Sequence, residues 1–528
     1  MATRSQTAAV LLAGALALAA CGSGGSGKSN GGSTAQGGGK TLVIDTSFDL
    51  KTADPGRTYE PTGLIIGKAA YETLLTFEGA DVTKPVPALA ESYELSEDGK
   101  VLTLKLKKGA TFADGSPVTA DDVVFSLTRV RDMKGTPSFL LDGVEVAKTD
   151  DSTVTLTSKQ ANPALPYILP NPALGILNSK LAKSHGATAD PQDKAEQYLN
   201  ASSAGSGPYQ IESFNVSSQV VLKKNDKYYG AKPFYDKVVI RNVEAATQKL
   251  NVQRGDSQVA LNLSGDQVTG MPANLTVKKT ASANVIFLFA NQDSGISKTT
   301  PNAKFVEAVR KGVDYAGLLE LAGEGATQTP GVIPSQLLGA LGADQAAKRD
   351  VEGAKAALAA SGLTNPTVKL EFPSELTVNG LSFQPLAERI QANLKEVGIT
   401  VDLQPAPVTT ALDNYRNGKE EMGLWYWGPD YPDPSDYLAF LPGKTVGLRA
   451  GWKDGADKTV SAAGDKAAAA VGEDARKQAY ADMQKQLNAS GPFVPLIQPS
   501  QNIVTAASVT GLEYHPVWTV DVADLTGK

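Results

Sequence analysis

The residues best suited to chemistry lie between Trp425 and Asp436, where the chain reads Trp-Tyr-Trp-Gly-Pro-Asp-Tyr-Pro-Asp-Pro-Ser-Asp. Two of the four tryptophans and three carboxylates fall within these twelve residues. Aromatic walls can bury apolar ligand surface, and a carboxylate in a partly dry cleft pairs well with a ligand ammonium. The same pattern also fits core tryptophans followed by a Pro/Asp surface turn. On the residue pattern alone, both interpretations stay open.

Other residue types that do chemistry are scarce in this chain. The 528 residues include one Cys, Cys21, and two His, His185 and His515. One Cys excludes a disulfide within the chain and any multi-thiolate zinc or iron–sulfur site, and two His argue against His-rich metal sites. We therefore expect no metal and no cofactor. The 50 Lys and Arg nearly balance the 56 Asp and Glu, and no basic run is present, so we expect no nucleic-acid partner.

The elements that must position the Trp425–Asp436 segment follow a β-α-β pattern. Alternating and 3.6-residue apolar periods predict strands at 368–372, 399–403 and 422–427, with helices at 385–397 and 408–417 between them. Pro385 is placed to open the first helix and Gly398 to end it. Such repeats build a parallel sheet covered by helices, and ligands bind beyond the carboxyl ends of its strands. The loop after Trp427 is therefore the expected site.

Three local patterns upstream also predict structure. Residues 41–45 and 102–106 read as strands, and Thr119 with Asp122 reads as the capping pair of a helix start. Arg129 and Arg131 follow in that helix, and we expect them on its solvated face.

The N-terminus reads as an export signal. Arg4 precedes an apolar run of thirteen small residues from Ala8 to Ala20, which is shorter than the roughly 20 residues that span a bilayer. Leu18-Ala19-Ala20-Cys21 resembles the bacterial lipobox, in which the Cys is lipidated and becomes the first mature residue. The alternative is an ordinary signal peptide that is cleaved nearby, in which case Cys21 is incidental and carries no lipid. Nine Gly and four Ser in residues 22–39 predict a flexible tether.

Over nearly the whole mature chain, short motifs occur in an order that resembles a known family. They include Pro87-Ala-Leu-Ala-Glu-Ser-Tyr93, Phe112-Ala-Asp-Gly115, Pro117-Val-Thr119-Ala-Asp-Asp122, Gly205-Ser-Gly207-Pro208-Tyr209, Asn225-Asp-Lys-Tyr228-Tyr229, Pro330-Gly331-Val-Ile-Pro334 and the Trp427–Tyr437 segment. The sequence is similar to solute-binding protein family 5, the large extracellular binding proteins of peptide, nickel and related ABC importers.

This resemblance implies an α/β fold of the two-lobed periplasmic-binding-protein type (class II, cluster C) with an extra inserted domain. The expected division is a signal peptide at 1–20, a lipidated Cys and Gly/Ser linker at 21–40, lobe I at 41–78, 206–282 and 494–528, the inserted domain at 79–205, and lobe II at 283–493. The lobes would close on the ligand about a hinge crossed near 283–291 and 492–496.

In peptide-binding relatives, the segment similar to Trp427-Gly-Pro-Asp430 supplies ligand contacts. The resemblance implies that Asp430 pairs with a peptide ammonium and that Trp427 lines a side-chain pocket. Trp425, on the same strand face, is a further candidate. Arg57 and Tyr59 follow the first strand, where the family places cleft residues; Arg57 could meet a ligand carboxylate or lie exposed on the surface. For Asp433 and Asp436 we favour structural roles in the loop.

The resemblance thus implies a binding protein and no enzyme. We expect a monomer, lipid-anchored at the outer face of the cytoplasmic membrane, that captures short peptides and delivers them to an ABC permease and ATPase complex. The alternatives are another family ligand (an oligosaccharide, a nickel chelate or an opine), a ligand-sensing lipoprotein and, more remotely, a lipid-tethered hydrolase. No Gly-x-Ser-x-Gly or His-Glu-x-x-His motif supports the hydrolase.

Overall fold

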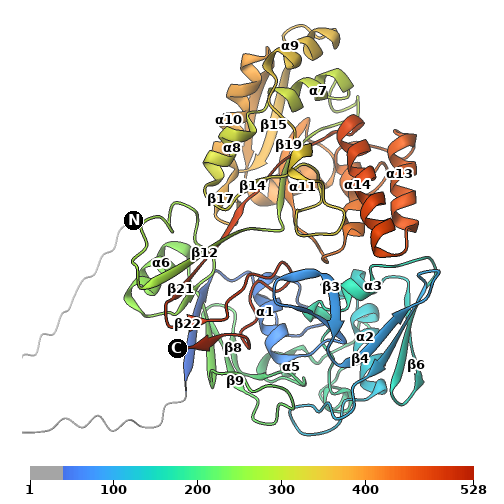
Figure 1. Cartoon of the computed structure of the whole chain (residues 1–528), viewed down its shortest axis with the longest axis vertical. Helices are drawn as coiled ribbons and strands as arrows, with labels where there is room; N and C mark the ends of the chain where they lie inside the picture. Colours follow the sequence, from blue (N-terminus) through green and yellow to red (C-terminus); the bar gives the residue numbers. More distant parts are fainter. Residues whose placement is uncertain (1–39) are drawn as a thin grey trace, which may run out of the picture. The chain divides into compact units, whose positions relative to one another are not determined.

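The computed structural model describes residues 40–528, so the expected signal peptide and the lipidation site Cys21 lie outside the described residues. Within this range, no helix combines the length and hydrophobicity that crossing a membrane would require. Three larger sheets and short two-stranded sheets organise the described chain (Figure 1).

The first sheet is seven-stranded and mixes parallel with antiparallel pairs. Its strands, in spatial order, are β12 (Leu275–Ala281), β21 (Ser500–Ala506), β11 (Val259–Ala260), β1 (Thr41–Thr46), β10 (Lys237–Asn242), β9 (Gln219–Lys224) and β8 (Tyr209–Asn215). β1 runs parallel to both β10 and β11, and Thr46 stands beside Asn242. The carboxyl ends of these three strands therefore meet at one edge of the sheet.

The second sheet is six-stranded and contains the predicted β-α-β repeat. Its strands, in spatial order, are β14 (Thr327–Gln328), β20 (Phe493–Gln498), β13 (Val285–Ala290), β19 (Met422–Trp427), β15 (Thr367–Pro373) and β18 (Thr400–Ala406). β15 pairs in parallel with β18 and with β19, as the repeat predicts. The sheet as a whole is mixed, which the repeat did not predict, because β13 pairs antiparallel with both β19 and β20.

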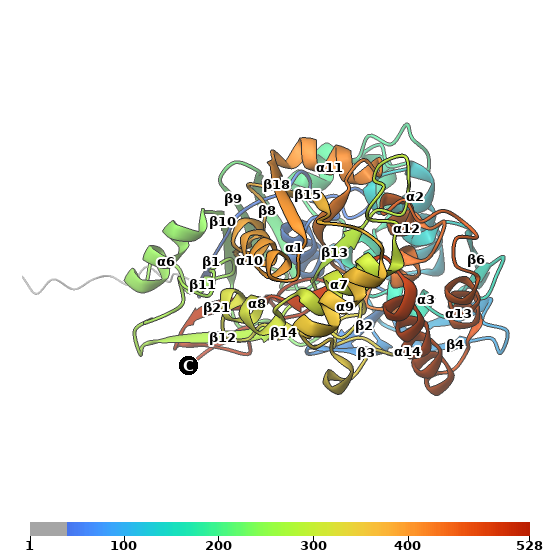
Figure 2. The ribbon, with the colours of Figure 1, turned by 90° about the horizontal axis from the view of Figure 1, so that it is seen from above.

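Helices cover both faces of the six-stranded sheet (Figures 1 and 2). One face carries α7 (Ala303–Gly312), α8 (Tyr315–Ala322), α9 (Val351–Ala360) and α10 (Phe383–Glu396), whose apolar residues form one core with Leu288 and Leu424. The other face carries α11 (Val408–Arg416), α13 (Lys458–Ala469) and α14 (Glu473–Ser490), which share a core with Trp425. α10 begins two residues before Pro385, within the first turn where a missing N–H is tolerated.

The third sheet is four-stranded and lies within the segment 79–205. It consists of β4 (Ala90–Leu95), β5 (Val101–Leu106), β7 (Thr153–Ser158) and β6 (Val144–Asp150). The helix α2 (Ala120–Met133) packs on it and begins with the predicted capping box, because Thr119 and Asp122 each accept a hydrogen bond from the other's backbone N–H. Leu104 of β5 and Trp425 of β19 belong to one continuous hydrophobic core.

The remaining elements are short and mostly connect these sheets. They are α1 (Pro61–Ala70), α3 (Leu165–Ile168), α4 (Ser179–Ser184), α5 (Glu196–Ala201), α6 (Ala245–Arg254), α12 (Thr445–Arg449), the 3₁₀ turns η1 (Thr136–Leu141), η2 (Pro172–Leu174), η3 (Ala343–Gln345) and η4 (Pro434–Phe440), and the strands of the two-stranded sheets, β2 (Leu75–Glu78) with β3 (Asp81–Pro87), β16 (Thr377–Val378) with β17 (Leu381–Ser382), and β22 (Val509–Thr510) with β23 (Thr526–Gly527).

The chain passes between the seven-stranded and six-stranded sheets twice. β12 leads into β13 through residues 282–284, and β20 leads into β21 at Pro499. The backbone N–H of Ser282 donates to the carbonyl of Pro499 at 2.9 Å, so the two crossings are hydrogen-bonded to each other. Residues 494–498, expected in lobe I, belong to β20, which pairs with β13 and β14 of the six-stranded sheet. The lobe boundaries as a whole stay a prediction.

Candidate functional site

A cavity of about 780 Å³ has walls that come from both large sheets. On the side of the seven-stranded sheet it is lined by the residues after β1, β10 and β11, among them Ser47, Asp49, Glu244 and Asn262. On the side of the six-stranded sheet it is lined by Tyr426 and by the residues after β19. This is the position at which α/β sheets bind ligands, beyond the carboxyl ends of their strands. The volume lies within the range of small-molecule sites.

Asp430 lines this cavity in the loop after β19, as the sequence predicts. Its backbone N–H donates to Asp436 Oδ2 at 3.2 Å, and its carbonyl accepts the hydroxyl hydrogen of Tyr59, which reaches across from the segment before α1. Burial raises the pKa of the Asp430 carboxyl to about 6, although the positive charge of Arg449 acts in the opposite direction. This carboxyl thus lies in a partly dry wall, and a cation in the cavity would stabilise its ionised form.

Tyr59 is the second predicted residue that lines the cavity. Its ring packs edge-on against Phe139 with centroids 5.3 Å apart. Burial and the neighbouring Asp430 raise the pKa of the Tyr59 phenol well above its usual value, so the phenol keeps its proton and can donate. The Tyr59 hydroxyl therefore links the two walls of the cavity at the Asp430 loop.

Trp427 and Trp425 point to the face of β19 opposite the one that carries Leu424, and neither is among the cavity-lining residues. The indole N–H of Trp427 donates to Asp436 Oδ2 at 2.9 Å. The Trp425 indole N–H donates to Glu420 Oε2 at 2.8 Å, and its ring stacks on Tyr415 with centroids 4.4 Å apart. Trp425 is thus a core residue, and Trp427 supports the loop that carries Asp430. Ligand contact by either residue stays a prediction.

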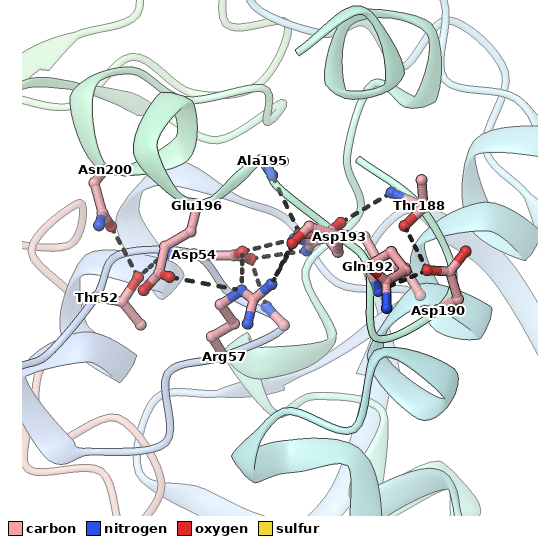
Figure 3. A network of polar contacts seen from close by, with 12 residues as sticks. Thr52, Asp54, Arg57, Thr188, Asp190, Gln192, Asp193, Ala195, Glu196 and Asn200 are labelled. Atoms are coloured by element: carbon pink, nitrogen blue, oxygen red, sulfur yellow. Dashed lines mark hydrogen bonds and ion pairs between the residues drawn. The ribbon is translucent and has the colours of Figure 1, made fainter. Parts of the chain in front are cut away.

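Arg57 is not among the residues that line the cavity, and its guanidinium lies in an ionic network with buried carboxylates (Figure 3). Its guanidinium lies 3.1 Å from Asp193 Oδ1 and 3.3 Å from Asp54 Oδ2, and its side chain is 26% exposed. The structure therefore does not bring Arg57 together with Asp430 and Tyr59. Contact between Arg57 and a ligand carboxylate stays a prediction.

The expectation of a solvated Arg129 was wrong. The Arg129 side chain is 0% exposed, and its guanidinium contacts Asp54 at 2.6 Å and Asp193 at 2.8 Å. Burial would raise the pKa of Asp193, but the bonds from Arg129 outweigh it and hold that pKa below its usual value. Arg131, two residues on, pairs with its neighbour Asp132 and is 24% exposed.

Asp433 and Asp436 have the structural contacts that were expected of them. Asp433 is buried, caps η4 through the N–H of Ser435 and pairs with Arg476 at 2.7 and 2.8 Å. Asp436 accepts the two bonds from Trp427 and Asp430. Burial and the nearby Asp430 charge raise the pKa of Asp436 well above its usual value.

Several amide side chains in the cavity were missed by the sequence analysis. Asn284 Nδ2 donates to Asn379 Oδ1 at 2.9 Å, and Asn379 in turn donates to Gln501 of β21. Asn379 and Gly380 both have positive φ, 53° and 81°, as a two-residue hairpin turn requires. The Asn-Gly dipeptide was a usable turn signal, whereas its contact with Gln501, 122 residues away, had none.

Gly428 is needed for close packing at the start of the same loop. A Cβ there would lie 2.3 Å from Asn284 Oδ1. The absence of a side chain thus lets the Asp430 loop approach the crossing between β12 and β13. Within residues 40–528, no group of three or more His, Cys, Asp or Glu side chains is arranged to hold a metal ion.

Comparison with known proteins identifies the fold. The chain is 20% identical to the ABC transporter substrate-binding protein CtaP of Listeria monocytogenes, with a TM-score of 0.81 over 93% of this chain and 99% of that one. The peptide-bound DppA of Helicobacter pylori is 23% identical, with a TM-score of 0.74 over 92% and 98%. The predicted fold class, that of family 5 periplasmic binding proteins, is confirmed.

Sequence similarity to known proteins also covers most of the chain. The chain is 28% identical over 494 residues to a protein of Escherichia coli named probable D,D-dipeptide-binding periplasmic protein DdpA, covering 90% of this chain and 92% of that protein. It is 26% identical over 512 residues to di/tripeptide-binding protein 2 of Pseudomonas aeruginosa, covering 90% and 93%. Residues 84–447 match the model of the bacterial extracellular solute-binding proteins, family 5. The predicted resemblance is therefore confirmed, and the chain belongs to this family of extracytoplasmic ABC-importer binding proteins.

Proposed function

We propose that this chain captures short peptides in the cavity between its two large sheets and delivers them to an ABC permease, without transforming them. The observation that carries the proposal is the Asp430 carboxyl, which lines the cavity and forms no ion pair with a described residue. A peptide ammonium would supply the missing partner. The names of the relatives DdpA and di/tripeptide-binding protein 2 support this ligand class.

Capture would proceed by closure of the two walls around the ligand. The Tyr59 hydroxyl holds the Asp430 loop from the opposite wall, and Asn379 reaches Gln501 in the same way. Closing the cavity removes water from the Asp430 carboxyl, which strengthens a charge-assisted hydrogen bond to an ammonium. Amides such as Asn284 and Asn262 can bond to peptide groups of any sequence, which leaves side chains to looser, hydrated contacts.

The proposal includes membrane attachment through a lipid on Cys21. The Gly/Ser-rich segment 22–39 would then act as a tether between the outer face of the membrane and the folded chain. We also propose that the chain works as a monomer.

The test replaces Asp430 by Asn, which keeps the shape of the side chain and removes its charge. Calorimetry should show that Asp430→Asn weakens the binding of a free-amine tripeptide at least about tenfold, the value of one charge-assisted hydrogen bond. N-acetylation of the peptide should weaken binding to the original protein by a similar factor and make little further difference to the variant.

The matched control is Asp402→Asn on β18, where the carboxylate is exposed and outside the cavity. It should bind like the original protein. Unchanged affinity of Asp430→Asn for free-amine peptides would contradict the proposed role of Asp430.

A further inference from the structure

The charged residues that line the cavity all have the same sign. They are Asp49 after β1, Glu244 after β10 and Asp430 after β19. None of the described residues that line the cavity is Lys or Arg. Arg449 acts on Asp430 electrostatically, but its guanidinium lies against the rings of Tyr415 and Trp427, which do not line the cavity. The cavity wall thus presents negative charge alone.

These three carboxylates have no cationic partner among residues 40–528, because none of them forms an ion pair at 4.0 Å or less. Two other acidic side chains near the cavity are satisfied within the protein, since Glu60 pairs with Lys51 and Asp436 accepts two hydrogen bonds. Burial raises the pKa of Asp49, although hydrogen bonds from its own backbone and from Thr62 oppose the effect. Two facing walls of the cavity therefore each carry a carboxylate that has no ion-pair partner among the described residues.

A second feature of the same cavity also points to a ligand. Asn171 is 2% exposed and lines the cavity beside Tyr59, and its Nδ2 is buried without a well-formed hydrogen bond to a described residue. Its Oδ1 is already used, because it accepts the N–H of Ala173 at 2.9 Å. A buried donor without an acceptor is costly, and a ligand carbonyl or hydroxyl oxygen would satisfy it.

We propose that the cavity selects ligands with at least two cationic groups, one for Asp430 and one for Asp49 on the opposite wall, and that it disfavours a free carboxylate inside the cavity. This inference rests on the proposed function and adds the charge of the ligand to it. Among short peptides, the preferred class is basic and lacks a free C-terminal carboxylate within the cavity.

The physical reason is the cost of burying an unpaired charge. A ligand carboxylate enclosed on closure would lose its hydration, meet no Lys or Arg among the described lining residues and face three carboxylates. A second ligand cation would instead neutralise Asp49, and the rings of Tyr426 and Tyr514 in the wall can also contact a cation favourably. The negative charge of the wall therefore discriminates between cationic and anionic ligands that fit the cavity equally well by shape.

The experiment measures, by calorimetry on the full chain, a set of tripeptides that differ only in charge. The second residue is Lys, norleucine or Glu between two alanines, and each peptide is prepared as the C-terminal acid and as the amide. The Lys amide should bind at least about tenfold more tightly than the norleucine amide, and each acid should bind more weakly than its amide. Asp49→Asn should reduce the preference for Lys over norleucine, while Asp256→Asn, an exposed carboxylate at the amino end of β11, should leave it unchanged.

Equal affinity for the Lys, norleucine and Glu peptides would overturn the inference while leaving the capture of peptides intact. A preference for Lys that survives in Asp49→Asn would overturn the assignment of Asp49. A trimer of glucosamine and its fully N-acetylated form provide a matched pair outside the peptides. If every peptide fails and only the free-amine trimer binds, the proposed peptide function is wrong and the charge inference holds; if neither trimer binds either, both are wrong.

Discussion

Glu420 is a buried carboxyl directly under the strand that leads to the site. It accepts the Trp425 indole N–H on one oxygen, and its Oε1 has no hydrogen-bond partner among the described residues. Burial raises its pKa to about 9, the Trp425 bond opposes this, and the charge of Glu371 adds to it. In the folded chain Glu420 is therefore protonated at neutral pH, whereas in the unfolded chain it is ionised.

This difference predicts how stability changes with pH. Between the unfolded pKa near 4.5 and the folded pKa near 9, the folded chain binds one proton more, so Glu420 makes stability fall as pH rises, by about 1.4 kcal/mol per pH unit. Glu420→Gln is neutral at every pH and should remove that part of the slope. Calorimetric melting temperatures between pH 5 and 9 measure it.

The control for this prediction is Glu388→Gln on the exposed surface of α10, which should melt with the same pH slope as the original chain. If Glu420→Gln and the original chain show parallel melting curves across this pH range, Glu420 is ionised in the folded state and the assignment is wrong.

At the residue scale, two residues singled out from the sequence line the cavity: Asp430, chosen because it follows a strand end, and Tyr59, chosen from the family resemblance. Sequence reasoning could not locate residues whose environment depends on distant partners. Arg129 is the example: its partners Asp54 and Asp193 are 75 and 64 residues away, and the local pattern shows only an Arg on an amphipathic helix.

At the element scale, the repeat from β15 through α10, β18 and α11 to β19 was predictable because each element carries its own apolar period. The antiparallel neighbours β13 and β20 were not, since their continuous apolar runs show burial but carry no information about direction or partner. The site loop was therefore found, while the mixed sheet that supports it was not.

The helix α2 provides a test of how a buried ionic network fixes an element. Arg129 joins α2 to Asp54 after β1 and to Asp193 before α5. Arg129→Met would leave two buried carboxylates with only Arg57 as a partner, and we expect it to destabilise the chain by about 3–5 kcal/mol. Urea denaturation followed by circular dichroism measures the shift in midpoint.

Arg131→Met, on the same helix, removes a partly exposed Arg paired with a neighbouring residue and should cost about 1 kcal/mol or less. If the two variants shift the midpoint equally, the buried network does not fix α2 and the prediction is contradicted.

At the scale of the whole molecule, side-chain contacts across the cavity connect the two large sheets. Tyr59 donates to the Asp430 carbonyl, and the Asn379–Gly380 turn contacts the opposite wall twice, through Gln501 and through Ser264, which a Cβ at Gly380 would approach to 2.7 Å. Besides these contacts, the backbone crosses between the sheets only at 282–284 and at Pro499 within the described residues. Close to these crossings, Lys279 of β12 pairs with Glu324, and Gln336 donates to the Ala281 carbonyl at 2.7 Å.

If the two walls of the cavity exchange between a closed and an open arrangement, removing the Tyr59 hydroxyl should shift that equilibrium toward the open one. Tyr59→Phe loses one hydrogen bond of about 1 kcal/mol, which is about fivefold in the equilibrium between closed and open forms. Hydrogen–deuterium exchange without ligand should then become about fivefold faster in the loop 428–431 and also in the distant turn 377–382, because opening frees both. Tyr93→Phe is the control, since its hydroxyl donates to Pro85 at 2.9 Å, away from the cavity. Faster exchange restricted to the residues around the substituted position would mean that the bond orders only its own loop, and closure of the two walls would then not depend on it.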